Sequence, residues 1–289
     1  YDEGITIRGL GGKRVNILID GIRVADSYTG YGRDVVEIDL LQRVEILKGP
    51  SSALYGSDGL AGAVAYTTKN PSDLFEIGNN YFSISSAYDQ SSEQTKLGVL
   101  GAHSNELFEG LLQLTARQLS ELELHDDATL ALNPLDGEQF SVFGKINIDL
   151  SESVDVSFTI DLQDWEGQWV LTSEEGMSYF PTMVSTDSSL GDDEGSRHRF
   201  SGSLSFGDGL GFFDTGAVSL FWQETDQMQI TRRQKTAFSM GPMGPPTALL
   251  EYRDYQFNQT ISGIAANFFK QTNFLGKQNN IIYGFEFES

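Results

Sequence analysis

From residue 79 onward, hydrophobic and polar residues alternate along much of the chain. In residues 140–150 every second position is apolar or small, and residues 154–163 repeat this arrangement. A period of two places the apolar side chains on one face of a β-strand. The pattern predicts about nine strands, at residues 80–89, 94–103, 107–119, 139–150, 153–165, 197–206, 212–230, 253–272 and 280–288.

The first 72 residues follow a different pattern. Short apolar runs separated by glycines predict buried strands at Ile5–Arg8, Val15–Ile19, Val44–Leu47 and Ala63–Thr67. Ser51 or Ser52 is placed to cap a one-turn helix through Tyr55. We therefore predict a mixed α+β domain over residues 1–72, followed by an all-β antiparallel domain over residues 73–289.

The alternation fits either a soluble sheet with one wet face or a membrane barrel with a polar lumen. Most predicted strands run about 9 to 15 residues, enough to cross a bilayer at a tilt and longer than the usual soluble strand. Lys145, Asp149 and Asp161 stand opposite the apolar face, as a wet lumen allows. Aromatic residues lie near strand ends, as at a membrane interface: Phe82, Tyr88, Phe108, Phe140, Trp165, Phe206, Phe212, Trp222 and Phe269. These features favour a transmembrane barrel.

The connections between predicted strands differ in length. Long loops are expected at residues 120–138, 166–196 and 231–252, and the connections at 89–93, 104–106, 150–153, 206–211 and 273–279 are shorter. Short turns at one end and long loops at the other are typical of outer-membrane barrels. Since the first two connections are both short, one of them must be a small external loop. An open edge is not tolerated in lipid, so we expect further strands after Ser289.

Composition excludes several classes. The 289 residues include no cysteine, so disulfides cannot contribute to stability. The net charge of −22 argues against a nucleic-acid partner. The acidic segments 121–127 and 187–194 are expected to be solvated loops, although a divalent cation at Asp192, Asp193 and Glu194 is an alternative whose spacing is not that of an EF-hand.

Four segments in the first domain resemble the plug of TonB-dependent outer-membrane receptors. Arg43–Gly56 reads Arg-Val-Glu-Ile-Leu-Lys-Gly-Pro-Ser-Ser-Ala-Leu-Tyr-Gly, which is similar to the most characteristic stretch of that plug. Gly59–Val64 stands where the family has Ala-x-Gly-Gly-hydrophobic-Ile, with Ala63 in place of the second glycine. Ile7–Gly9 and Ile17–Arg23 match two further family patterns in the expected order. The barrel resembles the family by its pattern alone.

The resemblance implies a partial plug and the first strands of a barrel of about 22 strands, located in the outer membrane. It implies energised transport, an inner-membrane partner (TonB), contact with outer-membrane lipid and no enzymatic activity. It also implies that Arg8, Glu45 and Lys48 pair with charges on the barrel wall and lock the plug; ordinary solvated charges are the alternative. Tight plug turns are expected at four glycines, namely Gly49, Gly56, Gly59 and Gly62.

Within the family, the chain looks most like the haem and haemoprotein receptors. This resemblance lies in Leu220–Asp226, Thr231–Arg233 and Ile282–Glu286. It implies haem as the transported ligand, with a ferric siderophore or other cargo left open, and an extracellular haemoprotein as a further partner. Tyr28 and Tyr31 lie in the matching apical loop, 24–35, and phenolate can bind ferric haem iron. They depart from the common histidine pattern, and a packing role is the alternative.

The three histidines give one further candidate for cargo binding. His125 lies in a long acidic loop, whereas His103 is on the apolar face near a short turn and His198 begins a predicted strand. No catalytic triad, zinc-spaced cluster or phosphate-binding glycine loop is present, so we expect no catalytic residue, metal site or resident cofactor. A passive porin, an adhesin barrel and a secreted β-sandwich enzyme or lectin are the alternatives from other classes.

Overall fold

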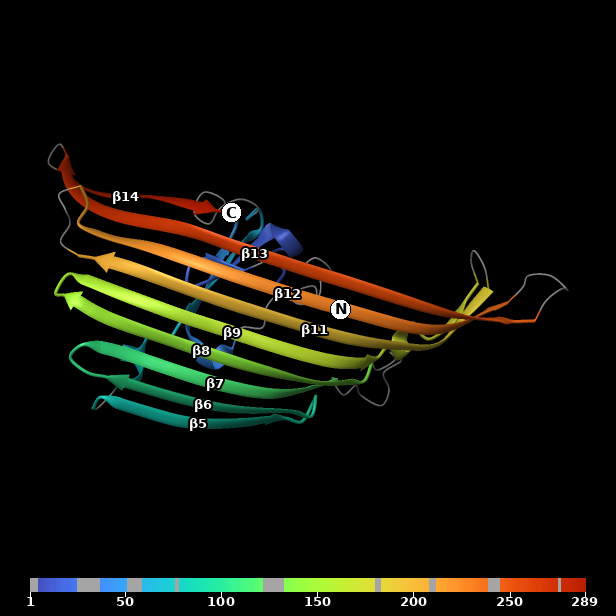
Figure 1. The fold of residues 1–289 in the computed structure, drawn as a ribbon. Helices are drawn as coiled ribbons and strands as arrows, with labels where there is room; N and C mark the ends of the chain where they lie inside the picture. Colours follow the sequence, from blue (N-terminus) through green and yellow to red (C-terminus); the bar gives the residue numbers. More distant parts are fainter. Residues whose placement is uncertain are drawn as a thin grey trace.

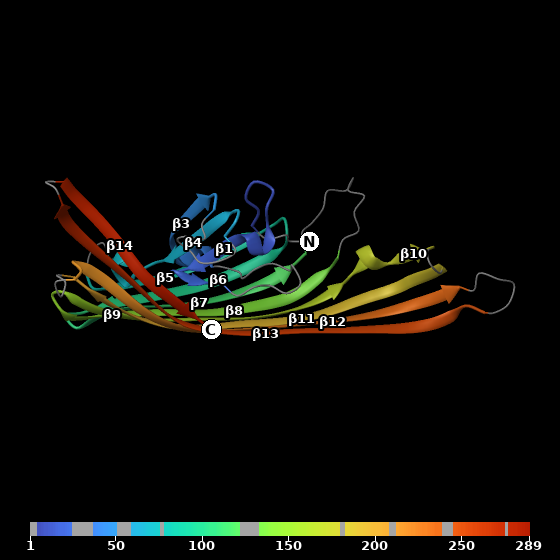
Figure 2. The ribbon, with the colours of Figure 1, turned by 90° about the horizontal axis from the view of Figure 1, so that it is seen from above.

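The computed structural model describes residues 5–24, 37–50, 59–75, 78–121, 133–179, 183–207, 212–238, 245–274 and 277–289. They form two separate sheets, one of four strands and one of ten. The smaller sheet lies on the concave side of the larger one (Figure 2). No helix among the described residues is long and apolar enough to cross a membrane.

The four-stranded sheet is built around its central strand, β1. Its order is β2 (Ile22–Arg23), β1 (Val15–Ile19), β4 (Gly62–Thr68) and β3 (Leu41–Lys48). β1 runs parallel to β4, and the other neighbours are antiparallel. All five residues of β1 are buried, the polar Asn16 among its four apolar residues included, as expected for a central strand covered on both faces. Three short 3-10 helices flank the strands: η1 (Gly12–Arg14), η2 (Ile38–Leu40) and η3 (Pro71–Leu74).

The predicted strand at Ile5–Arg8 is wrong. Ile7 forms only an isolated bridge with Leu10. Arg8 and Gly9 have φ angles of 52° and 79°, so the chain turns back on itself here. The other three predicted strands are confirmed as β1, β3 and β4. The predicted helical turn at residues 51–55 lies outside the described residues.

The ten-stranded sheet is antiparallel and follows the chain order, with β5 and β14 at its edges (Figure 1). β10 pairs only with the end of β11 and lies off the main path. The strands are β5 (Asn80–Asp89), β6 (Gln94–Ser104), β7 (Phe108–Ser120), β8 (Leu135–Ser151), β9 (Val154–Val170), β10 (Gly176–Ser178), β11 (Met183–Phe206), β12 (Thr215–Phe238), β13 (Thr247–Phe274) and β14 (Lys277–Glu288).

All nine predicted strands are present, but several are much longer than predicted. β11 begins at Met183 rather than 197, and β12 and β13 extend through most of the expected loop at 231–252. The acidic segment 187–194 is therefore part of a strand and not a loop. In these extensions polar residues occupy both faces: Glu138, Glu166 and Glu194 are exposed and stand opposite one another on β8, β9 and β11. Backbone pairing continues where the hydrophobic alternation ends.

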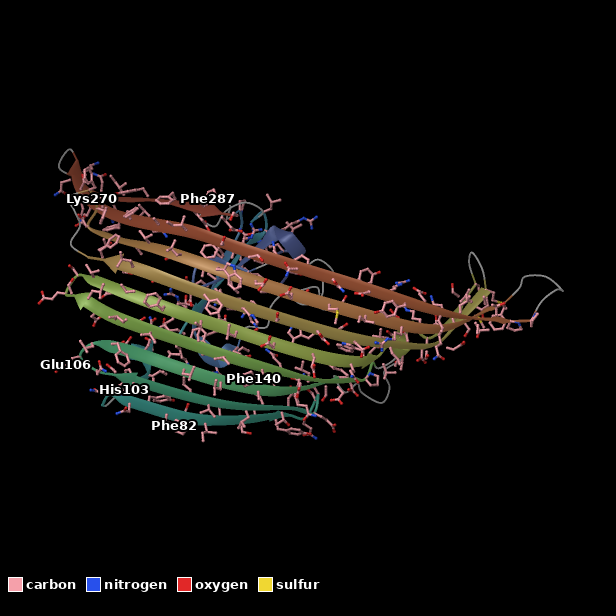
Figure 3. All side chains as sticks on the ribbon, in the orientation of Figure 1. Phe82, His103, Glu106, Phe140, Lys270 and Phe287 are labelled. Carbon is pink, nitrogen blue, oxygen red and sulfur yellow. The ribbon has the colours of Figure 1, made fainter. Side chains whose placement is uncertain are left out.

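The two ends of the ten-stranded sheet differ. In Figure 1, β6, β8, β11 and β13 end at the left, where β7, β9, β12 and β14 begin, and the long strand extensions lie at the right. The turn β5–β6 lies at the same end as the extensions. Of the two short connections at 89–93 and 104–106, the first is therefore the small loop on the side of the long loops. Glu106, in the next turn, lies at the opposite end (Figure 3).

An apolar band covers the outer face of the ten-stranded sheet. Its exposed members alternate with residues that face the smaller sheet, and Phe82, Phe140 and Phe287 are labelled in Figure 3. Others are Ile84, Leu97, Leu112, Leu114, Ile146, Phe158, Ile160, Phe200, Leu204, Leu220 and Phe285. Such a band on a continuous strand array is what lipid contact requires. His103 is at one end of it, where Nδ1 lies 2.8 Å from Asn80 Oδ1.

Candidate transport site between the two sheets

The inner face of the ten-stranded sheet is lined by buried polar and charged side chains. Because residues two apart on a strand share a face, this side includes Gln113, Thr115, Gln139, Ser141, Lys145, Asp161, Gln163, Arg197, Arg199, Gln223 and Thr225, each less than 9% exposed. The smaller sheet and its 3-10 helices contact this face through a limited number of side chains. Two groups of polar contacts are each centred on one buried charged residue.

The first group is the Glu37 clamp, formed by Glu37, Asp39, Lys96 and Arg117. The side chain of Glu37 is completely buried. Arg117 donates hydrogen bonds to both of its carboxylate oxygens, at 3.1 and 3.0 Å, and Lys96 Nζ lies 2.8 Å away. Lys96 also pairs with Asp39 at 2.7 Å. Lys96 and Arg117 stand opposite each other on β6 and β7. The ten-stranded sheet, which we call the wall, therefore presents two adjacent positive charges to the smaller sheet.

The second group is the Lys145 clamp, formed by Lys145, Asp20, Thr68 and Asn70. Lys145 Nζ on β8 donates to Thr68 Oγ1 at 2.7 Å and to Asn70 Oδ1 at 3.4 Å, and lies 3.7 Å from Asp20 Oδ2. Asp20 in turn accepts hydrogen bonds from Thr68 N and Oγ1, at 2.8 and 2.6 Å. One wall lysine therefore holds the turn after β1, the end of β4 and the start of η3.

Asp20 owes its position to a tight turn. Asp20 and Gly21 connect β1 to β2 with φ angles of 50° and 81°, the conformation that Asp-Gly favours in a two-residue hairpin. Next to it, Arg199 on β11 donates to the carbonyl oxygen of Ile19 at 3.3 Å. Arg199 is held by Asp161 on β9 at 2.8 Å. The hairpin is thus held by residues of two strands of the ten-stranded sheet, Lys145 on β8 and Arg199 on β11.

Apolar contacts support both clamps. Leu40 of η2 packs against Leu100, Ala102, Leu111 and Phe143 on the wall. Farther along the sheet, Ile22 of β2 packs against Phe221 and Ile261. The inner face is therefore apolar at these positions, because apolar residues of the smaller sheet require apolar partners.

The predicted lock residues lie elsewhere. Glu45 is exposed and contacts Arg43 of its own strand at 3.5 Å, and Arg8 and Lys48 are also exposed. Glu45 and Lys48 lie on β3, an edge strand of the smaller sheet. The acids and cations of the two clamps were missed because each pair joins residues far apart in the sequence. The available signal was that Lys145 is a charged residue at mid-strand, opposite the apolar face.

The other predicted site residues divide into described and undescribed positions. Tyr28, Tyr31, His125 and Gly56 lie outside the described residues. Gly49 and Gly62 have φ angles of 144° and 153°, and Gly59 is buried. At Gly62 a Cβ would also lie 2.1 Å from the carbonyl oxygen of Leu47. At this position a side chain is excluded both by the backbone angle and by the neighbouring strand.

Asp193 is an unusual acid beyond the apolar band, in the extension of β11. It is on the inner face, in phase with Arg197 and Arg199, whereas Asp192 is on the outer face and pairs with Arg232 at 2.7 Å. Burial raises the pKa of Asp193 to about 6, and a hydrogen bond with Trp169 opposes this rise. Among the described residues there is no group of three or more His, Cys, Asp or Glu that could hold a metal ion.

Known proteins with related sequences and folds agree with this architecture. Residues 1–63 match the family model of the TonB-dependent receptor plug domain. The chain is 28% identical to haemoglobin-binding protein A of Haemophilus influenzae over 77% of its own length and 24% of that protein. It is 30% identical to the hemin receptor of Yersinia enterocolitica over 43% of its length and 18% of that protein. It thus spans a quarter or less of these relatives.

A solved structure shows the same fold over almost the whole chain. The FrpB iron transporter of Neisseria meningitidis (F3-3 variant) aligns with 96% of this chain and 54% of its own chain, with a TM-score of 0.60 and 14% sequence identity. A plug sheet seated on the inner face of an antiparallel wall with an apolar outer band defines a plugged outer-membrane β-barrel. Residues 1–63 thus match the plug domain of the TonB-dependent receptors of the outer membrane. The end with short turns is then periplasmic, and the strand extensions are extracellular.

Proposed function

We propose that the full protein imports an iron chelate across the outer membrane with energy supplied through TonB, and that its cargo is haem. The observation that carries this proposal is the way the plug is held. Its described contacts with the wall are short ionic and polar pairs and two small apolar groups. Such contacts fix the plug at rest, and a pulling force can break them in sequence without disturbing the hydrogen-bonded wall.

The choice of haem rests on the relatives. One is named as a haemoglobin-binding protein and another as a hemin receptor. They support haem as cargo and an extracellular haemoprotein as a partner that delivers it. Tyr28 and Tyr31 of the apical loop and His125 remain our candidates for contact with haem, and Arg8, Glu45 and Lys48 remain candidates for contacts with wall strands beyond the ten described. No bond is made or broken in the proposed cycle, since the protein acts as a transporter.

Haemin binding tests the cargo assignment directly. Haemin added to the full-length receptor in detergent should shift its Soret band, and cells that depend on haem iron should need both the receptor and TonB for growth. The Tyr28→Phe and Tyr31→Phe variants should alter the shifted spectrum if either phenolate is an iron ligand.

Two other outcomes would point to other functions. Tight binding of a ferric siderophore with no response to haemin would favour a siderophore receptor of the same family, for which the FrpB likeness supports only the fold. Uptake that persists without TonB would favour a passive porin.

A further inference from the structure

A cluster of charged side chains lies at the extracellular end of the wall, well beyond the apolar band. It consists of Glu174 in η4 (Thr172–Glu174), Arg233 and Lys235 on β12, and Glu251 and Arg253 on β13. We call it the rim cluster. Its three cations and two carboxylates leave an excess of one positive charge, in a chain whose net charge is −22.

The rim cluster faces the lumen. Ile261 on β13 packs against Ile22 of the plug, and Gln223 on β12 stands opposite Ile261. The pairing of β12 with β13 continues without a register shift to Arg233 and Glu251. Residues an even number of positions apart on one strand share a face, so Arg233 and Glu251 point to the same side as Ile261. Cargo that enters from outside the cell meets this side.

Arg233 binds carboxylates of its own chain. Its Nε and NH2 groups donate to the two oxygens of Glu174, each at 2.6 Å, and NH1 donates to Glu251 at 3.1 Å. Two parallel hydrogen bonds of this kind are the most specific way in which arginine recognises a carboxylate. Glu251 is held in addition by Lys235 and Arg253. Glu174 therefore occupies the carboxylate-binding position of Arg233.

Glu174 reaches Arg233 from a short segment between β9 and β10. Ser173 of this segment exchanges two hydrogen bonds with Asn133, at 3.0 and 2.9 Å, and Ser189 donates to Glu174 at 2.7 Å. Hydrogen bonds from Arg233 and Ser189 lower the pKa of Glu174, so it is a carboxylate ion at neutral pH. Its side chain is 32% exposed, whereas that of Arg233 is 11% exposed.

We propose that Arg233 binds a carboxylate of the incoming cargo and that Glu174 is an internal stand-in which the cargo displaces. This inference rests on the proposed function, since haem carries two propionate carboxylates. Exchange of one carboxylate for another replaces each hydrogen bond that it breaks, so capture is reversible and release toward the plug remains possible. Displacement of Glu174 leaves η4 attached through the two hydrogen bonds between Ser173 and Asn133.

Haemin and haemin dimethyl ester provide the test, because the ester lacks only the two free carboxylates. Both are titrated into the full-length receptor in detergent and followed by the Soret band. The unmodified receptor should bind the ester about tenfold more weakly than haemin. Arg233→Gln should weaken haemin binding about tenfold and leave ester binding unchanged. Glu174→Gln should strengthen haemin binding about threefold by removing the competitor.

Two neighbouring residues supply matched controls. Arg232→Gln removes the same charge from the outer face, where Arg232 is 56% exposed, and Glu175→Gln changes an exposed acid beside Glu174. Neither change should alter haemin affinity. Heat-modifiable mobility on gels checks that each variant barrel has folded.

The opposite signs of the two main variants separate ligand recognition from a structural role. If Arg233→Gln and Glu174→Gln weaken haemin and ester binding alike, the cluster only supports the rim and the proposal is overturned. If the receptor binds haemin and ester equally, the proposal fails while the proposed function stands. Absence of any haemin binding would overturn both.

Discussion

The plug and the wall of this receptor are stabilised by different kinds of interaction. The wall is an antiparallel ladder in which β12 and β13 pair from Thr215–Phe269 to Ala237–Thr247 without a register shift. The plug has four short strands, a small core around β1 and two clamps. A wall whose backbone groups are satisfied along every interior strand can remain in lipid, whereas the plug depends on individual side chains. Continuous backbone pairing thus makes the wall permanent, whereas the plug is attached by few side-chain contacts and can be removed.

Gly62→Ala is expected to give the largest difference in stability between plug and wall. A Cβ at Gly62 would lie 2.1 Å from Leu47 O and 2.9 Å from Ile7 Cδ1, and φ is 153°. Strain of this kind costs at least about 3 kcal/mol, so β3 should separate from β4. Limited proteolysis of the full-length receptor should then cut the plug while the barrel keeps its heat-modifiable mobility.

Gly101→Ala is the matched control for this change. Gly101 is on the outer face of β6, and a Cβ there meets nothing within 4 Å. It should leave the plug as resistant to protease as in the unmodified receptor. Equal resistance of Gly62→Ala would show that β3 and β4 do not pair as described.

Glu37→Gln should have the next largest effect on the plug. It removes a fully buried carboxylate and leaves Lys96 and Arg117 facing each other without their shared partner. Loss of one member of a buried ion pair costs about 3 kcal/mol. The plug should become accessible to thiol reagents at a cysteine introduced near η2, with the barrel intact. Glu106→Gln is the control, because Glu106 is an exposed acid in the turn between β6 and β7.

Lys145→Met should have a smaller effect, because its partners retain other contacts. Asp20 keeps its hydrogen bonds from Thr68, and Arg199 still donates to Ile19. Methionine also fills much of the volume of the lysine side chain. We expect a loss of about 1–2 kcal/mol in plug attachment, measured by the same thiol accessibility near Asp20. A loss greater than that of Glu37→Gln would reverse the proposed ranking of the two clamps.

The difference between regular backbone pairing in the wall and individual side-chain contacts in the plug also determines what could be predicted from the sequence. Each wall strand was predicted within the apolar band, because alternation between lipid and lumen is recorded residue by residue. The sequence pattern predicts loops for the extensions of β11, β12 and β13, because both faces of these extensions are wet and only backbone pairing with neighbouring strands maintains them. The strand at Ile5–Arg8 was predicted from its apolar residues, but the turn at Arg8–Gly9 ends it.

The candidate site was less predictable than the fold. The glycine turns and the hairpin at Asp20–Gly21 could be inferred from local sequence. The two clamps could not be inferred in this way, because Glu37 and Lys145 contact residues of the other domain. The local sequence pattern of one domain carries no information about the other. A charged residue at mid-strand indicates that it faces the lumen but does not indicate which plug residue it will meet.

The smallest expected effect comes from Asp193, in the extracellular extension of the wall. Its pKa is raised from 3.8 to about 6, mainly by burial, so the fold disfavours its charged form. The destabilising contribution is absent below about pH 4, grows as the pH rises to about 6 and is complete above it. Asp193→Asn should therefore stabilise the receptor at pH 7.5 and leave it unchanged at pH 4. The gain should be less than about 1 kcal/mol, because solvent screens this partly exposed side chain.

Thermal unfolding in detergent at the two pH values measures this difference. Glu194→Gln is the matched control, since Glu194 is the next residue, is exposed and lies on the outer face of the same strand. It should show no pH-dependent gain. Equal behaviour of the two variants would mean that the inner face of the extension is as wet as its outer face. The extension of β11 would then be exposed to solvent on both faces. The part of the wall that holds the plug would end at the apolar band.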